Sequence, residues 1–333
     1  MVEVSYHDDP NVLPWAELAS ETPFDRREWF ELLAREAGLN PLLVLAREGR
    51  DACVLPLMRR GRALVPLANW YSFTWRHLAT SAEASRRLLP AIARDLKRRH
   101  SDVTLWPLAG EGGVAAELHD AFAAAGWWSA LEQCDVNHSL DVKGRSFADY
   151  LAERPGRLRT TLTRKAKHNE CDISLGFSDD AWDIYEEIYE QSWKPEEGSP
   201  AMLRAFAREE GAAGRLRLGI ARHQGKPVSA QLWTVESGTA FIHKLAHLEE
   251  ARALSSGTVL TAALMEHAID KDRAERVDFG TGDDAYKRDW MDEVRVRYRL
   301  TCLKRGDLRN WGAILRRGLR GAGTCEFYML SST

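Results

Sequence analysis

The 333-residue chain has no uninterrupted apolar run of the roughly 18 residues that a membrane-spanning helix needs. Its first residues, MVEVSYHDDPN, also lack the basic region and the apolar stretch of a signal peptide. We therefore expect a cytoplasmic protein without a transmembrane segment. The formal net charge of −3 argues neither for nor against nucleic acid, so any site for anions must come from local clustering.

Cysteine is scarce, and no CxxC pair occurs. The five cysteines are scattered along the chain, at Cys53, Cys134, Cys171, Cys302 and Cys325. This spacing and the odd number predict neither a disulfide framework nor a zinc ribbon. His243 and His247 share one face of a predicted strand but have no nearby acid or third ligand, so we expect ordinary strand histidines and no metal site.

Two short segments resemble parts of nucleotide-binding motifs, but the other residues that those motifs require are absent. Residues 278–280 spell Asp-Phe-Gly, as in protein kinases, but no HRD catalytic loop occurs. GIARHQGK at 219–226 has one residue too many for a P-loop, and Pro227 stands where a Ser or Thr would hold magnesium. These absences argue against a kinase and predict a strand and a hairpin turn at 219–226.

What is present is an ordinary globular composition, with 44% hydrophobic and 29% charged residues, which can bury a sizeable core. The length suits two domains better than one. In the first half the periodicity predicts helices at 25–38, 82–100 and 112–126, and strands at 42–47, 52–60, 63–73, 102–108 and 138–142.

The second half opens with RPGRLRTTLTRKAKH at 154–168, which holds six Arg or Lys residues and no acid. This run is either a solvated helix face or a site for an anion such as CoA phosphates, a nucleotide-sugar, a lipid phosphate or tRNA. The rest predicts helices at 179–193, 200–210, 256–270 and 284–291, and strands at 215–222, 228–236, 239–247, 276–280 and 294–303. A basic amphipathic helix at 308–320 either docks onto the protein or contacts an anionic membrane surface.

The segment RALSSGTVLTAALMEHAI at 252–269 joins a strand to an apolar helix through a loop of small residues. Such a loop exposes backbone N–H groups at the positive end of the helix dipole, where a phosphate can approach closely. Plain helix capping by Ser255 or Ser256 is the alternative interpretation.

The order of these elements resembles that of the GNAT acyltransferases, which have three antiparallel strands, a phosphate loop and helix, then strand, helix and strand. Their pyrophosphate loop reads Q/R-x-x-G-x-G/A, and residues 252–257 resemble it with Ser255 in place of the first glycine. The resemblance implies a cofactor-binding loop of Arg252, Ser255, Ser256, Gly257 and Thr258, and acetyl-CoA or another acyl-CoA as the co-substrate.

The stretch VDFGTGDDAYKRDW at 277–290 resembles a GNAT subgroup described as cellulose-biosynthesis or Fem-like acetyltransferases. The residues that match are Asp278, Phe279, Gly280, Gly282, Asp283, Tyr286, Lys287, Trp290 and the earlier Ser192-Trp193-Lys194. The resemblance covers 145–303 and implies an α+β fold of two tandem GNAT-like domains. Residues 1–145 would form a degenerate N-terminal domain and residues 146–333 the acyltransferase domain.

Acyl transfer needs a base, an oxyanion site, an acid for the leaving thiolate and a hold on the CoA phosphates. The resemblance implies Tyr286 as that acid, and His243 is the best base by residue type. Asp278 and Asp283 are alternative bases or substrate anchors. Lys287 either holds a phosphate or oxyanion or pairs with Asp283 or Asp284. The expected substrate-binding residues are Trp193, Lys194, Lys244 and Asp283.

Three functions follow from these residues and this resemblance. The first is an acyl-CoA-dependent N- or O-acyltransferase acting on a small molecule or an envelope-polysaccharide precursor. The second is a Fem-type transferase that uses aminoacyl-tRNA, which the basic run and the altered glycine loop favour. The third is a GNAT-like regulator that binds a nucleotide without catalysis. None of them requires a DNA partner.

Overall fold

The computed structural model describes residues 1–319, which lie in two compact units. Unit 1 comprises Met1–Val136 and the chain from Arg295 onward, and unit 2 comprises Asn137–Val294. The chain passes between the units twice, within β7 (Trp128–Asp141) and within β13 (Glu293–Leu303). Cys325 and residue 320 of the predicted basic helix lie outside the described residues. The predicted start of a second domain at residue 146 stays a prediction.

Unit 1 is built on a mixed sheet with the strand order β1-β2-β3-β4-β6-β13, in which β4 and β6 run parallel. The short β5 pairs with β3. The strands are β1 (Glu3–His7), β2 (Pro41–Glu48), β3 (Asp51–Arg60), β4 (Ala63–Pro66), β5 (Leu78–Ala79) and β6 (Asp102–Ala109). The helices are α1 (Arg27–Arg35), α2 (Ala82–Arg99), α3 (Val114–Ala124) and α9 (Trp311–Leu319).

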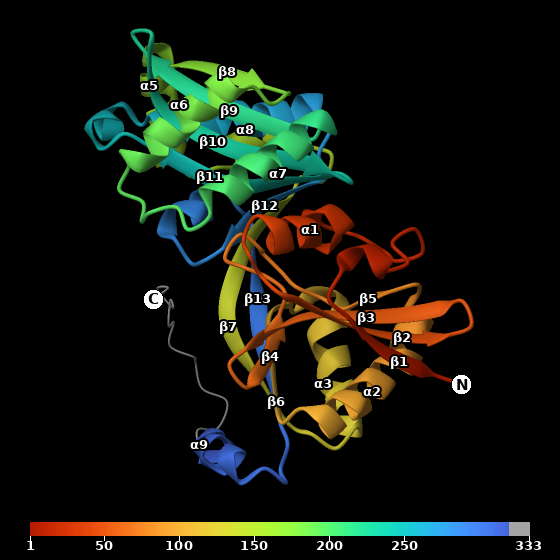
Figure 1. The fold of residues 1–333 in the computed structure, drawn as a ribbon. Helices are drawn as coiled ribbons and strands as arrows, with labels where there is room; N and C mark the ends of the chain where they lie inside the picture. Colours follow the sequence, from red (N-terminus) through yellow and green to blue (C-terminus); the bar gives the residue numbers. More distant parts are fainter. Residues whose placement is uncertain (320–333) are drawn as a thin grey trace. The chain divides into compact units, whose positions relative to one another are not determined.

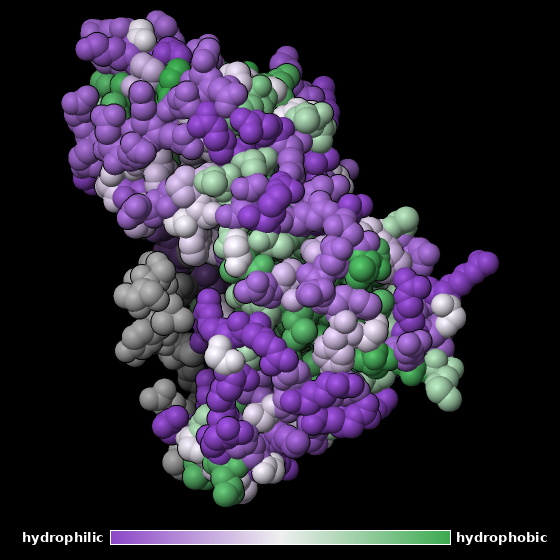
Figure 2. Space-filling model, viewed as in Figure 1, coloured by the Kyte–Doolittle hydropathy of each residue, from purple (hydrophilic) through white to green (hydrophobic). Residues whose placement is uncertain are grey.

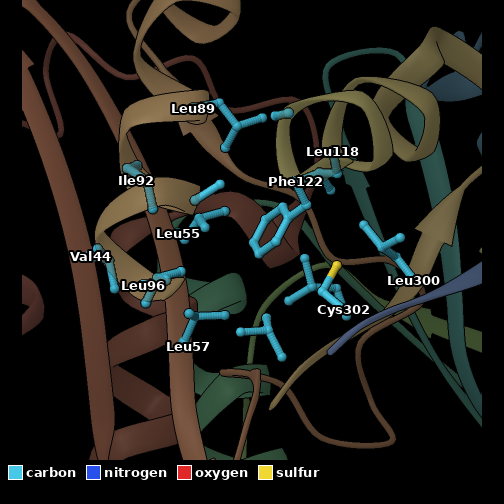
Figure 3. Packing of buried hydrophobic residues seen from close by; sticks show 14 of the residues in the cluster. Val44, Leu55, Leu57, Leu89, Ile92, Leu96, Leu118, Phe122, Leu300 and Cys302 are labelled. Atoms are coloured by element: carbon cyan, nitrogen blue, oxygen red, sulfur yellow. The ribbon is translucent and has the colours of Figure 1, made fainter. Parts of the chain in front are cut away.

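The core of unit 1 forms where the apolar faces of α2 and α3 meet the sheet (Figure 3). Leu89, Ile92 and Leu96 recur at helical spacing along α2 and are completely buried. Phe122 of α3 and Cys302 of β13 join them. Residues more than 200 positions apart in the sequence therefore share one core, which explains why β13 belongs to unit 1.

In unit 2, β8 to β11 are antiparallel neighbours, β12 runs parallel to β11, and the end of β7 pairs with the other edge of β12. The strands are β8 (Glu170–Ser174), β9 (Leu216–His223), β10 (Lys226–Glu236), β11 (Thr239–His247) and β12 (Arg276–Thr281).

Helices cover both faces of these strands (Figure 1). They are α4 (Phe147–Ala152), α5 (Gly156–Lys165), α6 (Asp179–Glu190), α7 (Pro200–Ala212) and α8 (Ser256–Glu266), which a π-turn extends to Lys271. Helix α8 packs on β8 to β11, and a Cβ atom added to Gly219 would lie 2.8 Å from Leu264 of this helix. Helices α6 and α7 lie on the other face, where Phe206 of α7 contacts His243.

The predicted mixed α+β fold is confirmed, and most predicted elements are found. The strand predicted at 63–73 ends at Pro66, and the strand predicted at 138–142 begins at Trp128. The helix predicted at 284–291 is a 3-10 turn over Ala285–Asp289. Strands β1 and β8 carry polar or charged residues at partly exposed edges, and their apolar patterns were too weak to predict them.

Candidate functional site

Strands β11 and β12 start as neighbours and then part. They pair only through Thr239–Arg276, Ala240–Val277 and Phe241–Asp278, although β11 continues to His247 and β12 to Thr281. The second half of β11 is paired with β10 alone. Along the second half of β11, beside the start of α8, the peptide groups on the side of β12 therefore form no ladder hydrogen bonds with β12.

A β-bulge at His243 accompanies this divergence. Ile242 pairs with Trp233 and Lys244 with Leu232, so His243 is the extra residue of β11. Its Nε2 lies 2.8 Å from Thr234 Oγ1, and its ring meets Phe206 edge-on at 5.0 Å. The bulge turns His243 toward α7, where it is held by side chains of unit 2.

The start of α8 has no side-chain cap. Ser255 precedes the helix with a φ of +52° and makes no capping hydrogen bond. Side chains also do not cap α1, α5 and α7, whereas serines cap α2, α4 and α6. The first N–H groups of a helix have no intrahelical acceptor and carry the positive end of its dipole. This end of α8 is therefore available to an anion.

Two further features distinguish this helix start. The hydroxyl of Ser256 is buried, and it has no hydrogen-bond partner among the described residues. Gln231 of β10 donates to the carbonyl of Gly257 at 3.0 Å and to Thr261 Oγ1 at 2.8 Å, which fixes the first turn of α8. Thr258 is half-buried in the same turn. Arg252 pairs with Glu249 at 3.2 Å on the exposed side of the preceding 3-10 helix (Glu249–Leu254).

The basic run lies close to this helix start. Asn169, at its C-terminal end, donates from Nδ2 to the carbonyls of Lys165 at 3.0 Å and Leu254 at 3.3 Å. Arg157 pairs with Asp289 at 2.5 Å. Within residues 1–319 no ion pair is formed by Arg159, Arg164, Lys165 or Lys167. Uncompensated positive charge is thus brought toward the uncapped end of α8.

The segment between α6 and α7 brings aromatic and cationic side chains to the same end of β11. Trp193 is 49% exposed and packs against His247 with ring centroids 4.2 Å apart and an angle of 36° between the ring planes. A Cβ atom added to Gly257 would lie 3.6 Å from the His247 ring, so this ring is next to the first turn of α8. The ammonium of Lys194 lies 5.2 Å above the Trp193 ring. Burial lowers the pKa of Lys194, and the carboxylates of Asp284 and Glu197 oppose that shift.

A partly buried ion pair anchors this segment to the sheet. Lys244 Nζ of β11 donates to Glu197 Oε1 at 2.9 Å and lies 5.2 Å above the ring of Tyr189. Burial lowers the pKa of Lys244, which Glu197 counteracts. Burial and the Glu197 carboxylate raise the pKa of Tyr189. Lys244 is thus committed to Glu197, whereas no acidic oxygen lies within ion-pair distance of Lys194 in the described structure.

The turn after β12 is held together from within. Gly280 and Gly282 have φ angles of +69° and +93°, which glycine adopts without strain. The ammonium of Lys287 is buried and donates to the carbonyls of Gly280, Thr281 and Gly282. Asp278 Oδ1 accepts from Gly280 N at 2.8 Å and from Asn137 Nδ2 at 2.7 Å. Lys287 and Asp278 therefore set the shape of this turn.

Asp283 at the tip of the turn binds two basic side chains. His138 Nε2 lies 3.1 Å from Asp283 Oδ1, and Arg288 bonds to both of its oxygens. Arg288 first, and His138 second, lower the pKa of Asp283. The carboxylate is consequently ionised and paired with protein groups.

Tyr286 projects from the 3-10 turn over β12. Its ring meets Phe279 at 5.5 Å in a T-shaped arrangement and is 39% exposed. Burial of the hydroxyl and the nearby Asp284 carboxylate raise the pKa of Tyr286. The hydroxyl is therefore protonated throughout the neutral range. Asp284 also influences Lys194, which links Tyr286 to the α6–α7 segment.

Residues 145–288 match the sequence model of the family described as acetyltransferase (GNAT) domain. FemX is 10% identical with a TM-score of 0.62, and the match covers 91% of this chain and 98% of FemX. L-PGS from Bacillus licheniformis is 12% identical with a TM-score of 0.55, over 86% of this chain and 95% of that chain. The fold is GNAT-like.

A third similar structure is the C-terminal domain of a protein described as a lysylphosphatidylglycerol synthetase from Agrobacterium fabrum. It is 13% identical with a TM-score of 0.57, over 86% of this chain and 89% of that chain. No curated protein sequence matches the chain. At these identities the solved structures establish the fold alone.

On this GNAT-like framework, the predicted site residues fall into separate groups. Glu197 acts on the pKa of Lys194 and Lys244, and Asp284 on that of Lys194 and Tyr286. Trp193 contacts Lys194 and also His247, which lies beside the start of α8. His243 contacts Thr234 and aromatic rings of unit 2. The remaining predicted residues, Asp278, Asp283 and Lys287, are bonded within their own turn or to β7.

Sequence reasoning missed Glu197, Tyr189, Gln231 and Asn169. Gln231 carries a signal, because it alternates with Ser229 and Trp233 along a strand that is otherwise apolar, which marks a polar contact on one face. The sequence PEEG at 195–198 gives no reason to choose Glu197 over Glu196. Only the folded loop shows that Glu197 contacts Lys244 of β11.

Proposed function

We propose that the chain is an acyltransferase whose donor lies between the diverging halves of β11 and β12, with its phosphates at the start of α8. The observation that carries this proposal is that β12 leaves β11 after three paired residues, next to a helix start without a side-chain cap. An extended donor arm needs free peptide groups, and a pyrophosphate needs free helix N–H groups. The transferase domain is proposed to start near residue 146.

The preferred donor is acetyl-CoA or another acyl-CoA. In the transfer, an acceptor amine or hydroxyl attacks the thioester carbonyl, the C–S bond breaks, and the departing thiolate takes a proton. We assign that proton to the Tyr286 hydroxyl, because its raised pKa keeps it protonated and it borders the diverging strands. The unpartnered Ser256 hydroxyl and the N–H groups of residues 256–258 would hold the pyrophosphate.

The acceptor is proposed to bind beside Trp193, Lys194 and Lys244. An aromatic ring with two ammonium groups and two nearby carboxylates suits a polar acceptor with an apolar sugar-like face. An envelope-polysaccharide precursor, such as an amino sugar, fits this description and the resemblance of residues 277–290. His243 is the candidate base by residue type, although its imidazole already bonds to Thr234.

A second function, aminoacyl transfer from tRNA, is favoured by the basic run. Arg159, Arg164, Lys165 and Lys167 have no acidic partner in the described residues and lie on the element that Asn169 ties to the α8 loop. A nucleic-acid backbone suits such a row of charges. The fold shared with FemX, and with a protein named for joining lysine to phosphatidylglycerol, is compatible with this donor.

Calorimetric titration with acetyl-CoA and with tRNA, in parallel, tests the two functions. The first predicts saturable acetyl-CoA binding that changes little when Arg159 and Arg164 are replaced by glutamate. The second predicts tRNA binding that weakens steeply with salt and is lost in the same variant. Folded protein that binds neither ligand at millimolar acetyl-CoA or micromolar tRNA would contradict both.

A further inference from the structure

One edge of unit 1 gathers cationic side chains from three segments that are distant in sequence. They are the end of β3 with the turn after it, the last turn of α2, and the chain from Lys304 to Arg317. Asn310 joins them, because its side chain donates to Ser101 O at 2.8 Å and accepts from Arg62. We call this the basic edge; it consists of Arg59, Arg60, Arg62, Lys97, Arg98, Arg99, Lys304, Arg305, Arg309, Arg316 and Arg317.

The acids near the basic edge neutralise only part of it. Four carboxylates form ion pairs there: Asp95 with Arg98 and Arg99, Asp102 with Arg62, Asp307 with Arg309, and Glu132 with Arg317. Within residues 1–319, six cations of this edge have no ion-pair partner, namely Arg59, Arg60, Lys97, Lys304, Arg305 and Arg316. The edge therefore presents a net positive charge although the whole chain has a formal charge of −3.

An apolar stripe runs through the basic edge. Leu308, Trp311 and Leu315 are spaced by three and four residues, so they lie on one side of α9 and the turn before it. They are 84%, 46% and 57% exposed. Green side chains lie among purple ones in Figure 2 where Figure 1 places α9. The Trp311 indole N–H donates to Arg305 O at 3.0 Å. The ring can therefore move from water into an apolar layer without leaving its N–H group unpaired.

We propose that the basic edge docks on the surface of an anionic lipid bilayer, with Leu308, Trp311 and Leu315 at the headgroup boundary. Two effects favour binding at such a surface. The apolar side chains are buried at the acyl boundary, and the flanking arginines are attracted to the anionic headgroups. A nucleic acid would satisfy the arginines but would leave the two leucines in water. No helix among the described residues is long and apolar enough to span the bilayer.

The chain's own C-terminus is a weaker occupant of this surface. Residues 320–333, RGAGTCEFYMLSST, contain one acid and one arginine, so they cannot neutralise six cations that lack an ion-pair partner. An anionic bilayer supplies many charges at once over the whole edge. The docking proposal does not depend on the transfer reaction, because every residue it uses lies in unit 1.

Co-sedimentation of the full chain with phosphatidylcholine vesicles, with and without phosphatidylglycerol, tests the proposal. We expect binding only to the anionic vesicles and release at high salt. Arg305→Glu with Arg316→Glu should lower partitioning at least about tenfold, since each cation near the surface adds about a fivefold factor. Leu308→Ser with Leu315→Ser should lower it about tenfold as well.

Matched controls are available at exposed positions away from the edge. Arg50→Glu reverses a charge at the other end of β3, and Val12→Ser removes an apolar side chain that is 48% exposed. Both should bind like the original chain, and circular dichroism should show all variants folded. Equal effects of control and edge variants would overturn the proposal.

Three other results would also overturn it. The first is a folded chain that binds no anionic vesicle. The second is binding that begins only after residues 320–333 are removed, because the chain's own terminus would then be the occupant. The third is tRNA binding that is lost in the double arginine variant while vesicles are ignored, which would make the edge a nucleic-acid surface.

Discussion

Lys244 on β11 and Glu197 in the α6–α7 segment form an ion pair across 2.9 Å, with side chains only 17% and 11% exposed. Removing one member of a buried pair leaves an uncompensated charge, which typically costs about 3–5 kcal/mol. Because both groups keep some contact with water, we expect Glu197→Gln to lower the free energy of unfolding by about 2–3 kcal/mol. Urea unfolding measures this change.

A double-mutant cycle separates the pair from its surroundings. Lys244→Met added to Glu197→Gln should restore part of the lost stability, since no charge is then left without a partner. Lys194→Met is the control, because Lys194 has no acid within ion-pair distance in the described structure. Strictly additive effects of the two substitutions would show that the pair does not hold the segment on β11.

Tyr286→Phe should lower kcat by about 10²–10⁴ and leave the Kd for acetyl-CoA unchanged, as expected for a general acid. Release of free thiol from acetyl-CoA measures kcat. Because burial and Asp284 raise the pKa of Tyr286, the rate should not fall from loss of its proton until the pH exceeds about 10. Tyr298→Phe, in unit 1, is the matched control. A Tyr286→Phe enzyme as fast as the original would remove this residue from the chemistry.

Ser256→Ala should separate donor binding from stability. The buried hydroxyl has no partner in the described residues, so its removal should leave the free energy of unfolding unchanged or slightly raised. The affinity for acetyl-CoA should fall about tenfold, because a hydrogen bond to a charged group contributes about 1.5–3 kcal/mol.

Ser178→Ala provides the opposite pattern. Ser178 caps α6 by accepting from Ala181 N at 3.2 Å, so its loss should cost about 1 kcal/mol of stability and leave donor affinity unchanged. Thermal unfolding and calorimetry on both variants measure the two quantities. A Ser256→Ala variant that loses stability but binds acetyl-CoA normally would identify Ser256 as a structural serine.

Unit 1 should lose stability in acid through Glu117. His77 first, and Ser85 by a hydrogen bond of 2.6 Å, lower the pKa of Glu117 to about 2 from its usual 4.5. A lowered folded-state pKa stabilises above the unfolded value, and that stability disappears as the pH falls from about 4.5 to about 2. After solvent screening we expect up to about 2 kcal/mol.

Glu117→Gln should flatten the stability curve in that range of pH. Asp120→Asn on the same helix is the control, because its carboxylate is 82% exposed and lies 3.2 Å from His119 at the surface. Chemical unfolding at a series of pH values gives both curves. An unchanged acid limb in Glu117→Gln would place the acid sensitivity elsewhere.

Local patterns in the sequence predicted the strands β9 to β12 and the helix α8, because their apolar periodicity and their Gly and Ser boundaries are features of single segments. The resemblance to GNAT acyltransferases, and not a local pattern, implied that residues 252–258 and 277–290 belong to one domain. Local patterns could not predict that the Lys287 ammonium donates to three carbonyls of its own turn. Those hydrogen bonds depend on the φ angles of Gly280 and Gly282.

Contacts between segments that are distant in the sequence could not be predicted from local patterns either. The pairing of Glu197 with Lys244 and of Asp283 with His138 arises only when loops close onto strands. The membership of β13 in unit 1 follows from the packing of Cys302 against α2 and α3, which no local pattern encodes.

The central claim is that the start of α8 holds the phosphates of an acyl donor, and Gly257→Asp tests it most directly. A Cβ atom there meets nothing closer than 3.6 Å, and an acid in the first turn of a helix stabilises it by about 0.3–1 kcal/mol. Calorimetry with acetyl-CoA should therefore find binding in the original chain and at least about a hundredfold loss in a variant that is no less stable. Unchanged affinity in the folded variant would contradict the account.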